Sequence, residues 1–97
     1  MYITILEGQV KEENWSQLEK DYESSIRHSP DGLVESFLIH CLDNRGLWKI
    51  ISVWKDEETY HFNKAKNVAK TCEQLFCDAG TTPHRTHFHV RQKYTRV

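Results

Sequence analysis

The pattern of hydrophobic and polar residues predicts six elements of regular structure. Hydrophobic residues alternate with a period of two, as in β-strands, in residues 2–10, 33–42, 47–54 and 85–93. They recur at steps of three and four, as on one side of an amphipathic helix, in residues 11–28 and 56–79. The second helix would be long for a small domain and is weakest at residues 64–67, so two helices separated by a break also fit the pattern.

Turn and capping residues lie between these segments. Residues 29–32 (Ser-Pro-Asp-Gly) end the first helix, because Pro30 disfavours helical angles at the residue before it and Asp-Gly suits a turn. Residues 43–46 (Asp-Asn-Arg-Gly) join the second and third strands as a hairpin. Asp56 is placed to cap the second helix, and Gly80 is placed to end it.

The order of the elements, β-α-β-β-α-β, restricts the topology. Right-handed crossovers that leave room for one strand between the first and the second give a four-stranded antiparallel sheet in the spatial order 4-1-3-2, with both helices on one face. This is the ferredoxin-like arrangement of the α+β class. We expect residues 1–97 to form a single domain, since a chain of 97 residues is too short to bury two cores.

The predicted strands are hydrophobic on both faces. In the second strand Phe37 and Ile39 point away from Leu38, and in the third strand Ile51 points away from Ile50. Two helices cover one face only, and the other would expose more apolar surface than soluble monomers usually tolerate. Burying about 600 Å² on each of two copies would contribute on the order of 30 kcal/mol before the costs of association. We therefore predict a symmetric homodimer with its sheets face to face, a dimeric α+β barrel.

Composition excludes several classes of partner. Thirteen basic residues against fourteen acidic ones leave no excess positive charge for a phosphate backbone, so we expect no nucleic-acid partner. No apolar run approaches the roughly 18 residues of a membrane span, and the N-terminal sequence lacks the features of a secretory signal. The three cysteines contain no C-x-x-C pair, so reduced thiols and a cytoplasmic location are expected.

Residues 31–65 carry the most recognisable pattern of the chain. They combine Asp-Gly-Leu at the start of a strand, a short hairpin, and Leu-Trp-Lys-Ile-Ile-Ser-Val-Trp followed by an acidic helix start. Trp54 at the end of the third strand and His61 seven residues later match positions that are common in antibiotic biosynthesis monooxygenase (ABM) domains. The chain thus resembles the ABM branch of the dimeric α+β barrel superfamily over nearly its whole length. That scaffold carries oxygenases, isomerases and haem enzymes, so the motif is more specific for the fold than for the chemistry.

The resemblance implies a reaction and a site. The best-understood members oxidise aromatic, polyketide-like substrates without metal, flavin or haem, because the substrate itself supplies the electrons. It thus implies a cofactor-independent monooxygenase for a small aromatic or quinol-like substrate, bound between sheet and helices, with no cofactor. Trp54 and Tyr60 would form walls of the pocket. His61 would be the base or anion-stabilising donor, and His40 a second polar contact. The alternative is a dimeric module that binds a hydrophobic ligand for regulation, without turnover.

Each candidate residue also has a structural interpretation. Trp54 can be a core anchor where the third strand meets the second helix. Phe62 falls on the buried side of the predicted helix, so His61 would lie at its border and face either a cleft or solvent. His40 shares a strand face with Leu38 and can be a hydrogen-bonded core or interface histidine.

Two metal-dependent possibilities receive less support. His87 and His89 share one face of the last strand, and His40 or Cys41 could complete a zinc site, but the polar face of an edge strand explains the same residues. By resemblance, haem degradation needs an Asn in the first strand and a Trp in the second helix. The first strand has no Asn, and Asn63 occupies the approximate place of that Trp, so haem degradation is disfavoured.

Overall fold

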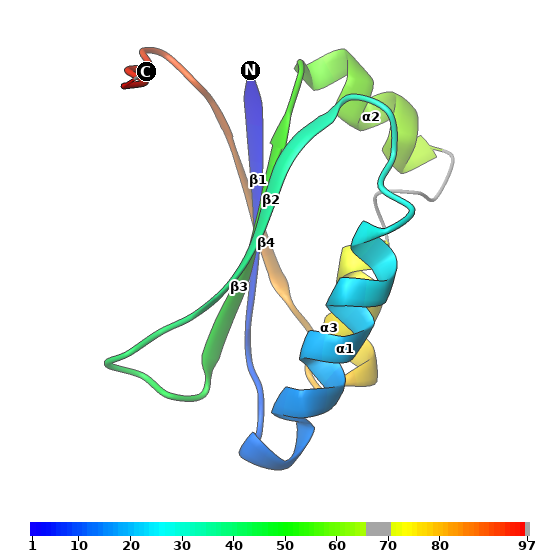
Figure 1. The fold of residues 1–97 in the computed structure, drawn as a ribbon, viewed down its shortest axis with the longest axis vertical. Helices are drawn as coiled ribbons and strands as arrows, with labels where there is room; N and C mark the ends of the chain where they lie inside the picture. Colours follow the sequence, from blue (N-terminus) through cyan, green and yellow to red (C-terminus); the bar gives the residue numbers. More distant parts are fainter. Residues whose placement is uncertain (66–70, 97) are drawn as a thin grey trace.

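The computed structural model describes residues 1–65 and 71–96. The strands are β1 (Tyr2–Gln9), β2 (Leu33–His40), β3 (Leu47–Trp54) and β4 (His84–His89). The helices are the 3₁₀ turn η1 (Glu12–Asn14), α1 (Trp15–Ile26), α2 (Glu57–Ala65) and α3 (Thr71–Asp78). The strands form one antiparallel sheet in the order β2-β3-β1-β4 (Figure 1), which confirms the predicted topology.

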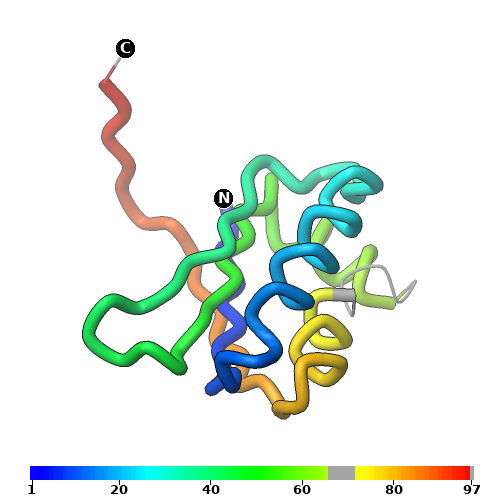
Figure 2. Tube along the Cα trace, turned by 60° about the horizontal axis from the view of Figure 1, so that its bottom comes forward, coloured from blue at the N-terminus to red at the C-terminus, as the bar shows by residue number. Residues whose placement is uncertain are grey.

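The three α-helices lie on the same side of the sheet, as predicted (Figure 1). Seen from another direction, the residues that follow β4 extend away from the sheet and helices (Figure 2). The opposite face of the sheet is therefore left without a helical layer in the described part of the chain.

β1 ends at Gln9, just before its predicted end, and β2 and β4 end earlier still because their partners run out. The last pair of β4 with β1 joins His89 to Tyr2, so the predicted continuation to residue 93 has no strand to pair with. β2 ends at His40, opposite Trp48. Leu42, which was predicted to continue that strand, lies in the hairpin and is 92% exposed.

The helices also differ in detail from the prediction. The predicted helix over residues 11–28 begins as the 3₁₀ turn η1 and continues as α1 to Ile26. The described parts of the predicted helix over residues 56–79 are α2 and α3. Of the possible break at residues 64–67, the first two residues are helical and the rest lies outside the described residues.

Burial alternates along the two central strands, β1 and β3, so one side of each faces the helices. A larger core cluster contains Leu18 and Phe76, both fully buried. A smaller cluster at the other end of the sheet consists of Tyr2, Trp54 and Tyr60. The smaller cluster therefore joins β1, β3 and α2.

The face of the sheet that the helices leave uncovered is hydrophobic, as predicted. Phe37 is 47% exposed, Ile39 41% and Phe88 50%. Ile51 of β3 pairs with both Phe37 and Ile5, so the apolar side chains adjoin one another across β2, β3 and β1. We call these five residues and their neighbours on that side the open face.

Gly32 fixes the approach of α2 to the loop before β2. Its φ of +90° is a conformation that other residues adopt only at a cost. The Lys55 N–H donates to the Gly32 carbonyl at 2.8 Å, and a Cβ at Gly32 would overlap the side chain of Thr59 in α2. Loop, β3 and α2 therefore meet at a position without room for a side chain.

Replacing Gly32 by Ala should destabilise the fold more than replacing Gly80. Both glycines have positive φ, at 90° and 89°, and this alone costs about 1–2 kcal/mol for a residue with a Cβ. A Cβ at Gly80 would meet only Asn14 Nδ2 at 3.6 Å, an ordinary contact, whereas at Gly32 it meets the stiff β-branched Thr59. Urea unfolding of both variants measures the difference, and equal losses would contradict this account of the α2 contact.

Candidate functional site

A cavity of about 170 Å³ lies between the sheet and the helices. Its walls come from the end of α1 and the loop after it, from β2 and β3, and from the start of α3. The lining residues with chemically distinctive side chains are Tyr22, His28, Ser36, Ser52, Trp54 and Cys72. The cavity thus combines an aromatic wall, a row of hydroxyls, an imidazole and a thiol.

Three hydroxyls, which we call the hydroxyl row, line the cavity: that of Tyr22 on α1 and those of Ser36 and Ser52 on the sheet. The Tyr22 hydroxyl donates to Ser36 Oγ at 2.8 Å. Ser36 and Ser52 are directly opposite each other in the β2–β3 ladder, so their side chains point to the same side. A ligand oxygen that displaces the serine could accept the Tyr22 hydrogen bond in its place.

Trp54 presents its ring to the cavity while its polar atom is satisfied elsewhere. Its Nε1–H donates to Thr4 Oγ1 at 3.2 Å, and both residues are buried. The side chain therefore contributes an apolar surface to the cavity and a fixed orientation. It serves as a core anchor, the structural interpretation of the sequence, and as a wall at the same time.

An arginine lies behind the cavity wall. Arg85 donates from Nη1 to the Tyr60 hydroxyl and from Nη2 to Glu73 at 2.6 Å. Its Nε is buried and has no hydrogen-bond partner in the described chain. Burial raises the pKa of the neighbouring Cys72 thiol, an effect that the positive charge of Arg85 opposes. Cys72 is consequently a neutral thiol at physiological pH rather than a thiolate.

Two of the four site residues predicted from the sequence lie together. The rings of Trp54 and Tyr60 are 5.4 Å apart and nearly perpendicular. Tyr60 is not among the residues that line the cavity, and it packs behind Trp54 and against Tyr2, at 5.3 Å. Burial raises the pKa of the Tyr60 hydroxyl, and the Arg85 guanidinium offsets part of that rise.

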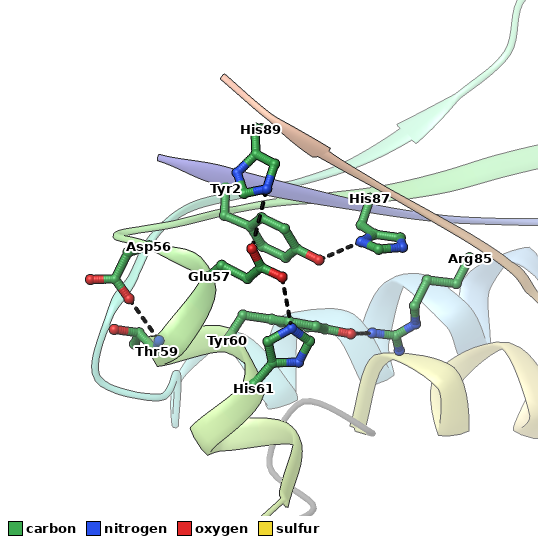
Figure 3. Close-up of polar contacts among 9 residues, drawn as sticks. All are labelled: Tyr2, Asp56, Glu57, Thr59, Tyr60, His61, Arg85, His87 and His89. Atoms are coloured by element: carbon green, nitrogen blue, oxygen red, sulfur yellow. Dashed lines mark hydrogen bonds and ion pairs between the residues drawn. The ribbon is translucent and has the colours of Figure 1, made fainter. Parts of the chain in front are cut away.

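His61 lies beside Tyr60 (Figure 3) and is not among the residues that line the cavity. Its Nε2 is 3.1 Å from Glu57 Oε2, and its side chain is 55% exposed. The other oxygen of Glu57 lies 3.2 Å from His89 Nε2, so one carboxylate faces two imidazoles. His87 Nδ1 is 2.5 Å from the Tyr2 hydroxyl.

The buried side of α2 differs from the prediction. Phe62 was expected on the buried stripe, but it is 60% exposed, and α2 buries Tyr60 and Asn63 instead. Asn63 donates to the carbonyls of Asp31 and Thr59, at 3.1 and 2.8 Å, so a polar residue fills the buried position. The helix is oriented by the packing of Tyr60 and by the hydrogen bond from Asn63 to Asp31 in the loop before β2, rather than by apolar spacing.

His40 lies at the opposite end of the sheet from Trp54. Its ring stacks on Trp48, with centroids 4.1 Å apart, and meets the edge of Trp15 at 4.6 Å. Its Nε2 is 2.5 Å from the Arg45 carbonyl oxygen in the hairpin. It does not line the cavity, so the structure separates it from the other three predicted site residues.

The geometry gives no metal site among the described residues. His40 and Cys41, considered as third ligands for His87 and His89, belong to the hairpin end of β2. No group of three or more His, Cys, Asp or Glu side chains in residues 1–65 and 71–96 is arranged to hold a metal ion. His87 and His89 instead contact Tyr2 and Glu57.

Sequence reasoning missed His28, the serine pair and Arg85. Period two places Arg85 on the same face of β4 as His87, which was a usable signal for its orientation. His28 follows the last turn of α1, and only the packing of its loop brings it to the cavity.

Comparison with known proteins identifies the fold. No family model matches the chain, and no curated protein matches it by sequence. A putative antibiotic biosynthesis monooxygenase from Deinococcus radiodurans has a similar structure, with a TM-score of 0.78 and 14% identity over 100% of this chain and 99% of that one. A mutant of SnoaB, a cofactor-independent oxygenase from Streptomyces nogalater, has a TM-score of 0.78 and 15% sequence identity, over 98% of this chain and 97% of that one. A conserved protein from Methanosarcina mazei has a TM-score of 0.73 and 17% sequence identity, over 91% of each chain.

These structures define the class of fold. The chain has the ferredoxin-like α+β fold found in antibiotic biosynthesis monooxygenases, as the sequence resemblance implied. Among the described helices, none has both the length and the hydropathy that crossing a bilayer would require.

Asp56 caps α2, as predicted, and its charge makes the cap dependent on pH. The Thr59 N–H donates to Asp56 Oδ1 at 2.7 Å. Hydrogen bonds from the side chain and the backbone of Thr59 hold the pKa of Asp56 below its ordinary value of 3.8. The ionised form therefore stabilises the fold above the unfolded-state pKa, and this contribution is lost as the pH falls through the folded-state pKa.

Replacing Asp56 by Asn tests this dependence, because Asn is also an N-capping residue but carries no charge. We expect the difference in unfolding free energy between wild type and Asp56→Asn to be constant near neutral pH and to shrink below about pH 4. Urea titrations at several pH values give this difference. A difference that stays the same down to acidic pH would show that the charge makes no contribution.

Proposed function

We propose that the protein is a cofactor-independent monooxygenase acting on a small aromatic or quinol-like compound bound in the cavity between sheet and helices. The cavity itself carries the proposal, because it pairs the Trp54 ring with the hydroxyl row and opens beside an imidazole. The fold shared with SnoaB, named a cofactor-independent oxygenase, supports it.

The cavity volume sets the size of the substrate. An apolar cavity of about 150 Å³ accommodates one benzene ring, and the volume here is about 170 Å³. A single phenolic or quinol ring fits inside, whereas a compound of several fused rings would have to extend out of the cavity. The proposed substrate is therefore smaller than a polyketide.

The chemistry needs a proton acceptor, an anion-stabilising donor and access for dioxygen. Removal of a phenol or enol proton gives an anion whose electrons reduce dioxygen. A ring C–H of the phenol is a CH₂ in its keto tautomer. When that CH₂ becomes C=O, one oxygen atom enters the product and the other leaves as water, so the substrate supplies all four electrons. We assign the proton acceptor to His28 and the hydrogen bond to the substrate oxyanion to Tyr22. Trp54 would be the wall on which the ring packs, with Tyr60 holding Trp54 in place.

A binding module without turnover is the second candidate. The Tyr22 hydroxyl already donates a hydrogen bond to Ser36, so these polar groups of the cavity have partners without any reaction. Such a site suits a hydrophobic ligand held for regulation. Free thiols at Cys41, Cys72 and Cys77 agree with a cytoplasmic location for either function.

Oxygen consumption with a panel of single-ring quinols and phenols in metal-free buffer tests the proposal. We expect uptake by the wild type, and a fall in kcat/KM of about tenfold or more, or about 1.4 kcal/mol, in His28→Ala and in Tyr22→Phe. His84→Ala is a matched control, since His84 is an exposed histidine away from the cavity. Ligand-induced thermal stabilisation with no oxygen uptake would favour the binding module.

The same assay tests the base predicted at His61. To reach a substrate in the cavity, its imidazole would have to leave Glu57 and turn past Tyr60. A tenfold fall in kcat/KM in His61→Ala, or about 1.4 kcal/mol in the barrier, with little change in His28→Ala, would identify His61 as the base. The opposite result assigns the proton transfer to His28.

We also propose that a second copy of this chain covers the open face. The exposed side chains of Phe37 and Ile39 on β2 and of Phe88 on β4 lie on the two edge strands and would adjoin those of a symmetric copy. A stable interface buries about 800 Å² on each partner, which a four-stranded face of this kind can supply. A second copy would bury the open face of both partners at once, whereas an unrelated protein or a ligand would cover the open face of one chain only.

Sedimentation should give a dimer at micromolar concentration. Phe37→Glu places a charge in the open face and should shift the protein to monomer, whereas Leu42→Glu, at a residue 92% exposed in the hairpin, should not. Circular dichroism checks that both variants are folded. A wild-type monomer at these concentrations would contradict the proposed dimer.

A further inference from the structure

Four residues form a continuous line from the cavity to the surface. Trp54 lines the cavity, and the Tyr60 ring lies 5.4 Å from the Trp54 ring. The Tyr2 ring is 5.3 Å from the Tyr60 ring, and the Tyr2 hydroxyl is 2.5 Å from Nδ1 of His87 (Figure 3). His87 is exposed on β4. The three rings between cavity and imidazole are the most easily oxidised types of side chain apart from those that contain sulfur.

The two tyrosine hydroxyls have opposite surroundings. The Tyr60 oxygen accepts a hydrogen bond from Arg85, a cation that takes up no proton. The Tyr2 oxygen faces an imidazole nitrogen that can accept one. A phenol becomes a strong acid when it loses an electron, so its oxidation is favourable only where the proton has an acceptor. Tyr2 therefore loses an electron more readily than Tyr60 does.

The same three rings are shielded from water. Trp54 is 4% exposed, Tyr60 2% and Tyr2 1%. Burial also raises the pKa of Tyr2, so the phenol keeps its proton until it is oxidised. At the outer end of the line His87 is exposed and can exchange a proton with solvent.

We propose that Trp54, Tyr60, Tyr2 and His87 form a relay that carries oxidising equivalents from the cavity to the surface. The relay rests on the proposed function, because the oxidant is a peroxyl radical formed in the cavity. One dioxygen takes an electron from the substrate anion and leaves as superoxide, and a second dioxygen adds to the resulting substrate radical. That radical takes one electron from Trp54 and becomes a peroxide anion. An electron then passes from Tyr2 to Trp54 across the Tyr60 ring, while the phenolic proton of Tyr2 moves to His87 Nδ1.

Reduction at the surface completes the cycle. A small soluble thiolate gives one electron to the Tyr2 phenoxyl radical, and His87 returns the proton. The thiolate becomes a thiyl radical, and two thiyl radicals couple to a disulfide. The protein is then unchanged, and the damage that an unproductive encounter with dioxygen would cause in the cavity has been avoided. In this account Trp54 both binds the substrate ring and protects the site.

Pulse radiolysis without substrate tests the relay. Azide radicals oxidise tryptophan in preference to tyrosine at neutral pH, and the decay of the indolyl absorption with growth of the phenoxyl absorption reports transfer between them. We expect transfer in the wild type. Trp54→Phe and Tyr2→Phe should each remove the same fraction of it, namely the part that runs between these two residues. His87→Gln should slow the transfer because it removes the proton acceptor.

Matched variants locate the path. Tyr60→Phe keeps the bridging ring and should keep the transfer, whereas Tyr60→Leu should abolish it. Tyr22→Phe removes a tyrosine that lines the cavity, and Tyr94→Phe removes an exposed tyrosine. Both variants should retain the electron transfer. Full transfer in Tyr2→Phe, or its loss in Tyr94→Phe, would overturn the relay.

This experiment separates the relay from the proposed function. Because no substrate is present, a missing transfer counts against the relay alone, and absent oxygen uptake with quinols counts against the monooxygenase alone. Under turnover, oxidation products of Trp54 should accumulate faster in Tyr2→Phe than in Tyr94→Phe, as measured by mass spectrometry of the peptides. Equal accumulation would overturn the protective role.

Discussion

The site depends on the packing of Tyr60 against Trp54 and Tyr2. This contact attaches α2 to the two central strands, and it does so at one end of the sheet, while Leu18 and Phe76 attach α1 and α3 nearer the other end. Between the two attachments the helices and the sheet are not in full contact, and the cavity lies there. The bulky aromatic pair of Trp54 at the end of β3 and Tyr60 in α2 thus keeps open a space that smaller side chains would let collapse.

The fold could be predicted from the sequence because the period of the apolar residues changes at each element. Strands with period two, helices with steps of three and four, and strong turn residues were sufficient to give the strand order and the covered face. The ends of β2 and β4 could not be predicted, since they depend on the length of the partner strand and not on their own residues. The buried side of α2 was wrong because Asn63 is buried through hydrogen bonds to carbonyls, which a count of apolar residues cannot include.

The candidate site was predicted less completely, for a related reason. Trp54 lines the cavity and Tyr60 packs behind it, as is expected of large aromatic side chains at the junction of two elements, while their part in binding a ligand stays a prediction. His40 and His61 were chosen for their chemistry and their place on an element, but whether a side chain enters a cavity depends on the loops around it. His28 belongs to such a loop, and Arg85 of the edge strand β4 lies behind the cavity wall, where it binds Glu73 of α3.

Tyr2 and His87 are separated by 85 positions along the chain, yet their side chains touch. During synthesis on a ribosome the N-terminal strand emerges early and must wait for β4 before its outer edge is paired. The β2–β3 hairpin and α2 can form in the meantime from neighbouring residues, but the closing strand arrives only with residues 84–89. The aromatic cluster therefore acquires its final partner, His87, only when β4 pairs with β1, and a nascent chain without that strand leaves the Tyr2 hydroxyl without this contact.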